Sequence, residues 1–191
     1  MKKLIRTDVR GPDLYGPIRD DLRKRIIELK KIRRVSVGPL VTLVFENRAT
    51  VIFQVEEMCR AENIREPEKI QEEIDVYNQI LPDPGELGAT LFVEITDMST
   101  LEQTLNQLVG LNEHVYLVVG GARVKATFDP RQFQADKLAA VQYIRFPLTA
   151  DAQAALRKAG TALSMVIDHP HYRHETTLSE ATRAELARDL D

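Results

Sequence analysis

Residues 44–77 read VFENRATVIFQVEEMCRAENIREPEKIQEEIDVY, and the rest of the chain can be placed around this stretch. An apolar run leads into it, and a turn rich in Pro and Gly at residues 82–85 follows it. Asn47 is a preferred N-cap residue, and the apolar residues after it recur at helical spacing. Pro67 suits the first turn of a second helix. The stretch therefore predicts two helices whose charged side chains lie between buried elements.

The residues before this stretch predict a long helix and one strand. Apolar residues recur at helical spacing from Ile18 to Leu29, so we expect a helix over residues 17–33. Residues 35–45 are rich in β-branched residues, and the break at Gly38 predicts a bent or bulged strand. Residues 1–16 are expected to form an irregular arm.

The second half of the chain is richer in strand-forming residues. Its clearest turn signal, Gly120-Gly121, predicts a hairpin over residues 114–128. The other strands are expected at residues 89–95, 140–146, 163–167 and 172–178, with short helices between and after them. Because the strands come in runs without a regular β-α-β rhythm, we expect a mainly antiparallel sheet.

These patterns together predict an α+β fold, in which a helical N-terminal layer packs on a mainly antiparallel, β-rich C-terminal body. The 191 residues are expected to form a single domain. In this interpretation residues 1–82 form the mainly helical layer with one strand, and residues 83–191 form the β-rich body with short helices.

Composition and charge exclude several classes of protein. The formal net charge of −3 argues against wholesale binding to nucleic acid or to an anionic membrane. A single cysteine leaves no intramolecular disulfide, Cys-based zinc site or iron–sulfur ligand set. Charged residues at positions 6, 8 and 10 interrupt what would be the apolar part of a signal peptide, and no stretch approaches the roughly 20 apolar residues of a membrane span. We expect a cytoplasmic protein.

The predicted first helix is strongly basic. Residues 19–34 contain eight basic and three acidic residues, a net charge of +5, whereas residues 56–75 contain eight acidic and three basic residues, a net charge of −5. The two segments are expected either to neutralise each other within the domain or to leave a surface for a protein partner, with Arg23, Lys24 and Lys31 as its candidate residues. Nucleic acid is disfavoured, because no aromatic residues interleave the basic ones.

Three of the four histidines lie within the segment from Asp168 to Glu175. Imidazole is a common metal ligand, so His169, His171 and His174 are candidate ligands of a divalent metal ion. In an extended segment His174 would point away from the other two, so further ligands would have to come from elsewhere. The alternatives are a small-molecule or catalytic site and a structural turn around Pro170.

The charged residues of the central stretch are candidates for a ligand or partner site. Glu46 and Arg48 are expected to form an ion pair, at least partly buried, at the junction of strand and helix. A sharper hypothesis is a pocket for a small anion that uses Arg48 and Arg145. Glu57 is expected to approach Glu73 across a pair of helices, but the Glu-x-x-His pairs of ferritin-type di-iron sites are absent from both segments.

The sequence contains none of the common signatures of hydrolases or nucleotide-binding proteins. There is no Gly-x-Ser-x-Gly and no Walker-type glycine-rich loop. Cys59 falls on an apolar helical face, where a thiol behaves as a small hydrophobic group and not as a nucleophile. These features favour a protein without catalytic activity.

Four segments carry a resemblance to a known family: LKKIRRVSVGPLVTLVFENRATVIFQVEEMCRAENI, IQEEIDVYNQILPDPGELGATLFVEI, VQYIRFPL and VIDHPHYRHETTLS. Together they resemble an uncharacterised bacterial family, domain-of-unknown-function family 3501, whose genes often lie beside those of rubrerythrin and iron–sulfur oxidoreductases. The resemblance extends from about Tyr15 onward and is most specific around residues 45–48. It implies a context of oxidative stress or electron transfer and no established catalytic residue.

Two hypotheses follow from these observations. The first is a non-catalytic accessory or binding protein for a cytoplasmic redox partner, such as a rubrerythrin-like or iron–sulfur protein. The partner would dock on the basic helix or on the charged junction between residues 46 and 62. The second is an enzyme that depends on a metal or a small ligand, with its site around the histidine cluster of residues 168–175.

Overall fold

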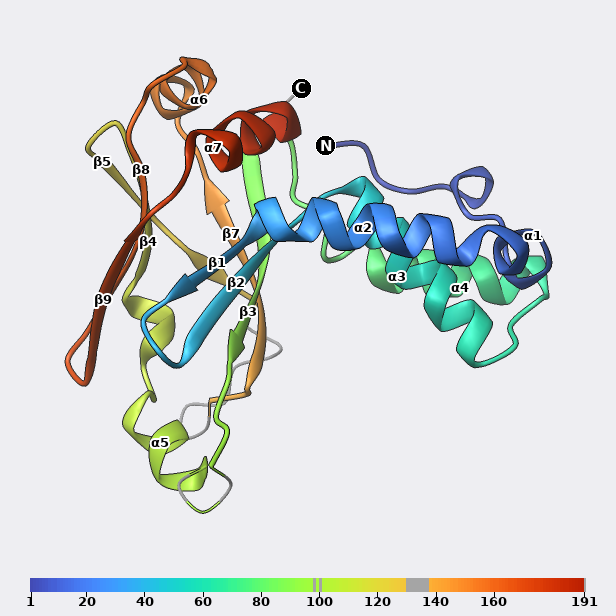
Figure 1. Ribbon diagram of the computed structural model, residues 1–191, viewed down its shortest axis with the longest axis horizontal. Coiled ribbons are helices and arrows are strands. Elements are labelled where there is room, and N and C mark those ends of the chain that lie inside the picture. The colour runs from blue at the N-terminus through green and yellow to red at the C-terminus, as the bar shows by residue number, and fades with distance from the viewer. Residues whose placement is uncertain (98, 100, 130–137, 191) are drawn as a thin grey trace.

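The computed structural model describes residues 1–97, 99, 101–129 and 138–190. It confirms the predicted α+β fold, since a group of helices near the N-terminus packs beside two antiparallel sheets (Figure 1). We call the helical part, residues 1–33 and 47–82, the arm. The two sheets and the helices that cover them form the body.

The first sheet, sheet A, has the strand order β1-β2-β3-β7-β6, with every neighbouring pair antiparallel. Its strands are β1 (Arg34–Val37), β2 (Val41–Glu46), β3 (Glu86–Val93), β7 (Val141–Pro147) and β6 (Thr127–Phe128). The prediction of one bent strand over residues 35–45 is wrong, because β1 and β2 form a hairpin. Gly38, with φ of 71°, supplies the left-handed backbone conformation that the turn requires.

The second sheet, sheet B, has the strand order β5-β4-β8-β9. Its strands are β4 (Val115–Val119), β5 (Ala122–Lys125), β8 (Leu163–His169) and β9 (Tyr172–Thr177). The hairpin predicted around Gly120-Gly121 is confirmed as β4–β5. The chain then leaves sheet B at Ala126 and enters sheet A as β6, so one extended segment serves both sheets.

The two sheets pack face to face around the main apolar core. Alternate residues of β2, β3 and β7 meet those of β4 and β8, and the rings of Phe45 and Phe146 lie 6.1 Å apart within this core. Tyr172 ties the sheets together at one edge, where its hydroxyl donates to the Val37 carbonyl (2.6 Å) and accepts from the Leu40 amide (2.9 Å). The body therefore has the thickness of two layers with a continuous interior.

Short helices cover the ends of the body. They are α5 (Leu101–Gln107), η4 (Leu111–Glu113), α6 (Ala150–Arg157), α7 (Glu180–Ala187) and η6 (Arg188–Leu190). Thr149 caps α6 and Ser179 caps α7, each through a side-chain oxygen that accepts a backbone N–H of the first turn. Leu156 and Leu186 of these two helices are fully buried against the core.

The arm has a second, smaller apolar core. Its helices are η1 (Arg6–Asp8), α1 (Pro12–Tyr15), η2 (Gly16–Ile18), α2 (Arg19–Arg33), α3 (Arg48–Ala61) and α4 (Pro67–Tyr77). Residues 1–16, expected to be irregular, therefore contain helical turns, because Pro12 starts α1 directly after Gly11. The core of the arm consists of Leu4, Val9, Val51, Val55, Cys59, Ile70, Ile74, Ile80 and Leu81.

A buried ion pair joins the arm to the C-terminal helices of the body. Arg33, at the end of α2, has no exposed side-chain surface, and its guanidinium donates to Asp189 (2.7 and 2.8 Å) and Glu185 (2.9 Å). Two parallel bonds to one carboxylate fix both the distance and the angle between the partners. Arg33 therefore sets how α2 leaves the body.

Among the helices that the structure describes, none offers the run of apolar residues needed to traverse a bilayer.

Candidate functional site

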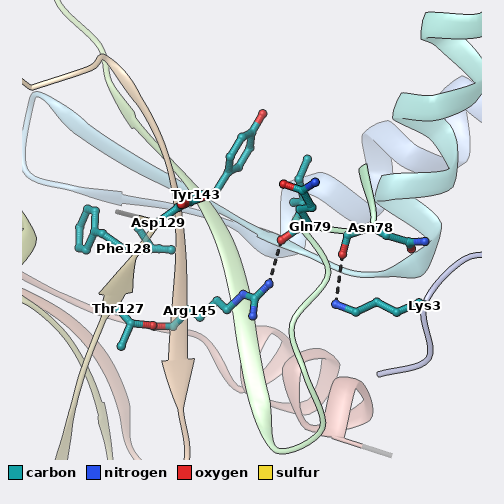
Figure 2. A pocket seen from close by; sticks show the side chains of 10 residues that line it. Lys3, Asn78, Gln79, Thr127, Phe128, Asp129, Tyr143 and Arg145 are labelled. Carbon is teal, nitrogen blue, oxygen red and sulfur yellow. Dashed lines mark hydrogen bonds between the residues drawn. The ribbon is translucent and has the colours of Figure 1, made fainter. Parts of the chain in front are cut away.

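A cleft of about 640 Å³ lies between the arm and β7 of sheet A (Figure 2). The arm side of the cleft is formed by Lys3 and by the segment that follows α4, and the sheet side by β6 and β7. The described residues that line it are Lys3, Asn78, Gln79, Ile80, Thr127, Phe128, Asp129, Tyr143, Ile144 and Arg145. We call this part of the cleft the Lys3 lobe. It combines apolar walls with polar groups that could fix the orientation of a ligand, as small-molecule sites do.

The two cations of the Lys3 lobe hold the cleft together. Arg145 pairs with Asp83 (3.0 Å) and donates to the Gln79 carbonyl (2.9 Å). Lys3 pairs with the same Asp83 (3.3 Å) and donates to the carbonyls of Leu81 (2.7 Å) and Asn78 (3.1 Å). Figure 2 shows the bond from Arg145 to Gln79 and the bond from Lys3 to Asn78. The nearby Lys3 ammonium lowers the pKa of Asp83 below its ordinary value. Both cations are thus already used by the segment 78–83, so this lobe does not present free positive charge to an anion.

A smaller cavity of about 440 Å³ continues the cleft and shares Gln79, Ile80, Asp129 and Tyr143 with it. We call this part the Glu73 lobe. Its described lining residues are Met58, Glu73, Val76, Tyr77, Gln79, Ile80, Asp129 and Tyr143. Burial, with the Glu73 carboxylate as the next cause, raises the pKa of Tyr77. Among its described lining residues, the lobe is therefore aromatic and has Glu73 and Asp129 as its charged groups.

Glu46 is a buried carboxylate close to the cleft. Only 3% of its surface is exposed, and it accepts hydrogen bonds from the hydroxyls of Thr50 and Thr90 (2.8 Å) and from the Gln54 amide (3.2 Å). All three donors are neutral. Burial, followed by the negative charge of Glu46, raises the pKa of Tyr143 in the cleft. The charge of Glu46, which lies where the arm meets the sheet, therefore acts on the Tyr143 side chain in the wall of the site.

The predicted ion pair between Glu46 and Arg48 is wrong. Arg48 pairs with Asp8 (2.7 Å) and donates to the carbonyls of Lys2 (2.7 Å) and Lys3 (2.8 Å). Asn47 caps α3 with its side chain, so Arg48 begins the helix with its side chain directed at the N-terminal segment. Arg48 anchors that segment and is absent from the lining of the cleft. The anion pocket built from Arg48 and Arg145 stays a prediction that this geometry does not support.

Glu57 also serves the arm itself. Its carboxylate accepts from the Tyr15 hydroxyl (2.6 Å) and forms a two-point ion pair with Arg19 (2.7 and 2.8 Å). The bonds from Arg19 are the largest cause that lowers the pKa of Glu57 to about 2. The same carboxylate raises the pKa of Tyr15, with burial as the larger cause. Glu57 therefore fastens the start of α2 to α3.

The exposed face of α2 is a second candidate site. Of its predicted partner residues, Arg23 and Lys24 have no ion pair within the described residues, and Lys31 pairs only with Glu28 on the same helix (2.7 Å). Ile27, 43% exposed, lies among them. The acidic α4 does not neutralise this face, since the one ion pair from α2 to the α3–α4 segment in the described residues joins Arg19 to Glu57.

The histidine segment is a turn between β8 and β9. The rings of His114 and His169 lie 5.2 Å apart, and those of His169 and His171 lie 5.8 Å apart. His169 is buried, its Nδ1 accepts from the His171 amide (3.3 Å), and its Nε2 therefore carries the proton donated to the Val109 carbonyl (3.1 Å). Burial also lowers the pKa of His169. Both ring nitrogens are engaged by the backbone in a neutral imidazole.

His174 lies apart from this group, with its ring packed 4.4 Å from that of Tyr172 and beside Gly38. Across residues 1–97, 99, 101–129 and 138–190, no three or more His, Cys, Asp and Glu side chains are placed to hold a metal ion together. The metal site of His169, His171 and His174 accordingly stays a prediction. Cys59 is fully buried, and burial raises its pKa to about 11, which disfavours the nucleophilic thiolate.

Sequence reasoning named Arg145, which lines the Lys3 lobe, but missed the aromatic residues that shape the cleft. Tyr77 was expected only as part of an apolar helical stripe, and Tyr143 lies in a strand that alternates in the ordinary way. Neither position carries a local signal, because the cleft forms only when the segment after α4 comes to lie against β7. Ile27 could have been found, since an isoleucine surrounded by basic residues on the outer face of a helix is a visible anomaly.

Comparisons with known proteins place the chain among proteins without a described activity. A family model described as "Protein of unknown function (DUF3501)" matches residues 3–190. A chain in a crystal structure of a novel protein of unknown function from Burkholderia pseudomallei K96243 is 35% identical, with 100% of both chains covered and a TM-score of 0.92. No curated protein matches the sequence.

Proposed function

Because the chain belongs to the DUF3501 family, whose description names no activity, we propose its function from its own surfaces. We propose that it is a non-catalytic binding protein that docks an acidic partner protein on the exposed face of α2. The second element of the proposal is that the partner is a redox protein of the rubrerythrin-like or iron–sulfur class.

The surroundings of Ile27 are the observation that carries the docking proposal. Residues three and four positions apart are neighbours on a helix surface, so Ile27 is surrounded by Arg23, Lys24, Lys30 and Lys31. We call these five residues the Ile27 patch. An exposed apolar side chain encircled by charge resembles the centre and rim of a protein interface, where the apolar anchor is buried and the rim aligns the partner.

Charge supports an acidic partner. Arg23, Lys24 and Lys30 have no ion pair among the described residues, although the chain as a whole carries a formal charge of −3. A local positive patch on a negative protein attracts an acidic surface in one orientation and repels it in others. The redox class of the partner is motivated by the genomic context that the family resemblance implies, together with the lack of a catalytic constellation in the described cleft.

Charge reversal on α2 tests the docking proposal. The purified protein and a rubrerythrin-like protein from the same host would be compared by biolayer interferometry at 50 and 300 mM NaCl. We expect binding that weakens at the higher salt concentration and falls at least about tenfold in the double variant Arg23→Glu/Lys24→Glu. Ile27→Ser should weaken binding at both salt concentrations, because it removes the apolar anchor.

The matched control reverses two exposed charges of the body, Lys158→Glu/Arg173→Glu, which changes net charge equally and leaves α2 intact. Equal loss in both double variants would show that only net charge matters and would reject α2 as the docking surface. Failure of the rubrerythrin-like protein to bind at low salt would reject the redox partner.

A further inference from the structure

The Glu73 lobe of the cleft has no role in the docking proposal, and its chemistry differs from that of the Lys3 lobe. Its walls are the rings of Tyr77 and Tyr143 and the side chains of Met58, Val76 and Ile80. Among its described lining residues there is no lysine or arginine. As far as its described lining residues go, the cavity is therefore apolar and aromatic on its sides, and its charged groups are acidic.

Glu73 supplies negative charge that nothing in the described chain neutralises. Its carboxylate is half-buried and has neither an ion pair nor a hydrogen bond within the described residues. Its field reaches the neighbouring groups, because Glu73 is the largest cause after burial that raises the pKa of both Cys59 and Tyr77. A half-buried carboxylate without a cationic partner in the described chain can pair with the charged group of a cationic ligand.

Glu46 adds to this field from strand β2, on the same face of sheet A as Tyr143. It is 3% exposed and is held by Thr50, Thr90 and Gln54, none of which carries charge. Its effect on the pKa of Tyr143 indicates that its charge is felt at the cleft. The two cations of the neighbouring Lys3 lobe are occupied by Asp83 and by backbone carbonyls, so they compensate neither carboxylate directly.

Aromatic faces beside the Glu73 carboxylate favour one class of ligand. The face of a tyrosine ring carries partial negative charge and attracts a cation within about 6 Å, most strongly when water is excluded. The rings of Tyr77 and Tyr143 and the thioether of Met58 would cover the alkyl chain of such a ligand, while Glu73 would bind its charged end.

We propose that the Glu73 lobe is a binding site for an organic cation, a primary alkylammonium group that pairs with Glu73 and packs against Tyr77 and Tyr143. The ammonium belongs either to a free amine or to a lysine side chain of a peptide. The site is independent of the Ile27 patch, so this proposal holds or fails separately from the proposed function.

The test is a ¹H–¹⁵N chemical-shift titration of the full chain with n-butylammonium at neutral pH. We expect saturable shifts at the backbone amides of residues 73–79 and 143. The neutral isostere 1-butanol should bind at least about tenfold more weakly, since it lacks the charge that Glu73 recognises. Glu73→Gln should weaken the binding of n-butylammonium by a similar factor. Tyr77→Leu should also weaken this binding, because it removes the aromatic ring and keeps an apolar side chain at the position.

Glu72→Gln is the matched control, because Glu72 precedes Glu73 on α4 but is exposed and absent from the lining of the cleft. The Glu72→Gln variant should bind n-butylammonium with the same affinity as the unmodified protein. The proposal is overturned if no shifts saturate, if 1-butanol binds as well as n-butylammonium, or if Glu73→Gln and Glu72→Gln behave alike.

Two further ligands distinguish the source of the cation. Tighter binding of 1,4-diaminobutane than of an acetylated, amidated Gly-Lys-Gly peptide assigns the site to free amines. The reverse order assigns it to a lysine side chain on a polypeptide. Both orders support an alkylammonium site, and binding of neither ligand contradicts it.

Discussion

The body and the arm of this molecule are held together by different forces. The body encloses a continuous apolar core between its two sheets, in which Phe45, Leu91 and Phe146 are fully buried. The arm has a much smaller apolar core and depends on carboxylates that bind its own N-terminal segment, Glu56 and Glu57 among them. The hydrophobic effect does not depend on the direction in which two apolar groups approach each other. Hydrogen bonds between charged groups, in contrast, fix the distance and the angle between the partners. Of the two candidate binding sites, the Ile27 patch lies on the arm, and the Glu73 lobe lies between the arm and β7 of the body.

The largest effect is expected where the arm meets the body. Arg33→Met would leave the buried carboxylate of Asp189 without its cation and should lower the free energy of unfolding by about 3–5 kcal/mol. Urea unfolding followed by circular dichroism measures this loss. The control Arg34→Met removes a half-exposed residue whose ion pair with Glu94 is also exposed. This control should lower the free energy of unfolding by less than about 1 kcal/mol. Equal costs for the two variants would contradict a special role for the Arg33 junction.

Substitutions that create a cavity in one of the two cores should have the next largest effects. Leu91→Ala in the body should cost about 3 kcal/mol and should lower hydrogen-exchange protection in both sheets, because the core between them is continuous. Ile74→Ala in the arm should lower protection of α3 and α4 and leave β4 and β8 unchanged. If both variants loosened the entire chain equally, the two cores would be one cooperative unit and the distinction between arm and body would fail.

Glu56 tests whether the arm depends on directional bonds. Its buried carboxylate accepts from the backbone amides of Arg10 (2.7 Å) and Gly11 (3.1 Å), and burial raises its pKa. Glu56→Gln would present an NH₂ group to one of these donors and should cost about 2 kcal/mol. In limited proteolysis, residues 1–18 should then be cleaved faster in Glu56→Gln than in the unmodified protein. The exposed neighbour Glu62, changed to Gln, should have no effect, and an unchanged cleavage rate in Glu56→Gln would contradict this role.

The smallest effect is a dependence on pH. The folded-state pKa of Glu57 is about 2, below its ordinary value of 4.5, so its stabilisation is complete above about pH 4.5 and is lost as pH falls toward 2. Glu57→Gln should therefore destabilise the protein by about 1–2 kcal/mol at pH 6, with a difference that shrinks toward pH 2. Thermal unfolding at pH 6, 4 and 3 measures it. A difference that stayed constant with pH would show that Glu57 acts by packing alone.

The sequence predicted most of the fold because its signals are local. Asn47 and Pro67 marked the starts of α3 and α4, and Gly120-Gly121 marked the β4–β5 hairpin. The error at residues 35–45 has a specific cause. A Gly-Pro pair between two apolar runs fits both a bulge and a hairpin turn, and only the pairing of Arg34 with Val44 distinguishes them.

The candidate sites were less predictable, because they depend on partners distant in the sequence. Glu46 and Arg48 are two residues apart, yet Glu46 bonds to Thr90 in the neighbouring strand and Arg48 to Asp8 in the N-terminal segment. The basic character of α2 was readable from composition. Composition did not show which of these charges remain unpaired. Arg33 is buried in an ion pair, whereas Arg23 has no ion pair within the described structure.

Hydrogen–deuterium exchange of the protein with and without the rubrerythrin-like protein tests the central claim most directly, which is that partners dock on the exposed face of α2. We expect slower exchange over residues 19–33, with the strongest protection around Ile27 and with exchange in β8 and β9 unchanged. Protection confined to the sheets, or none on α2 under conditions where the complex forms, would contradict it.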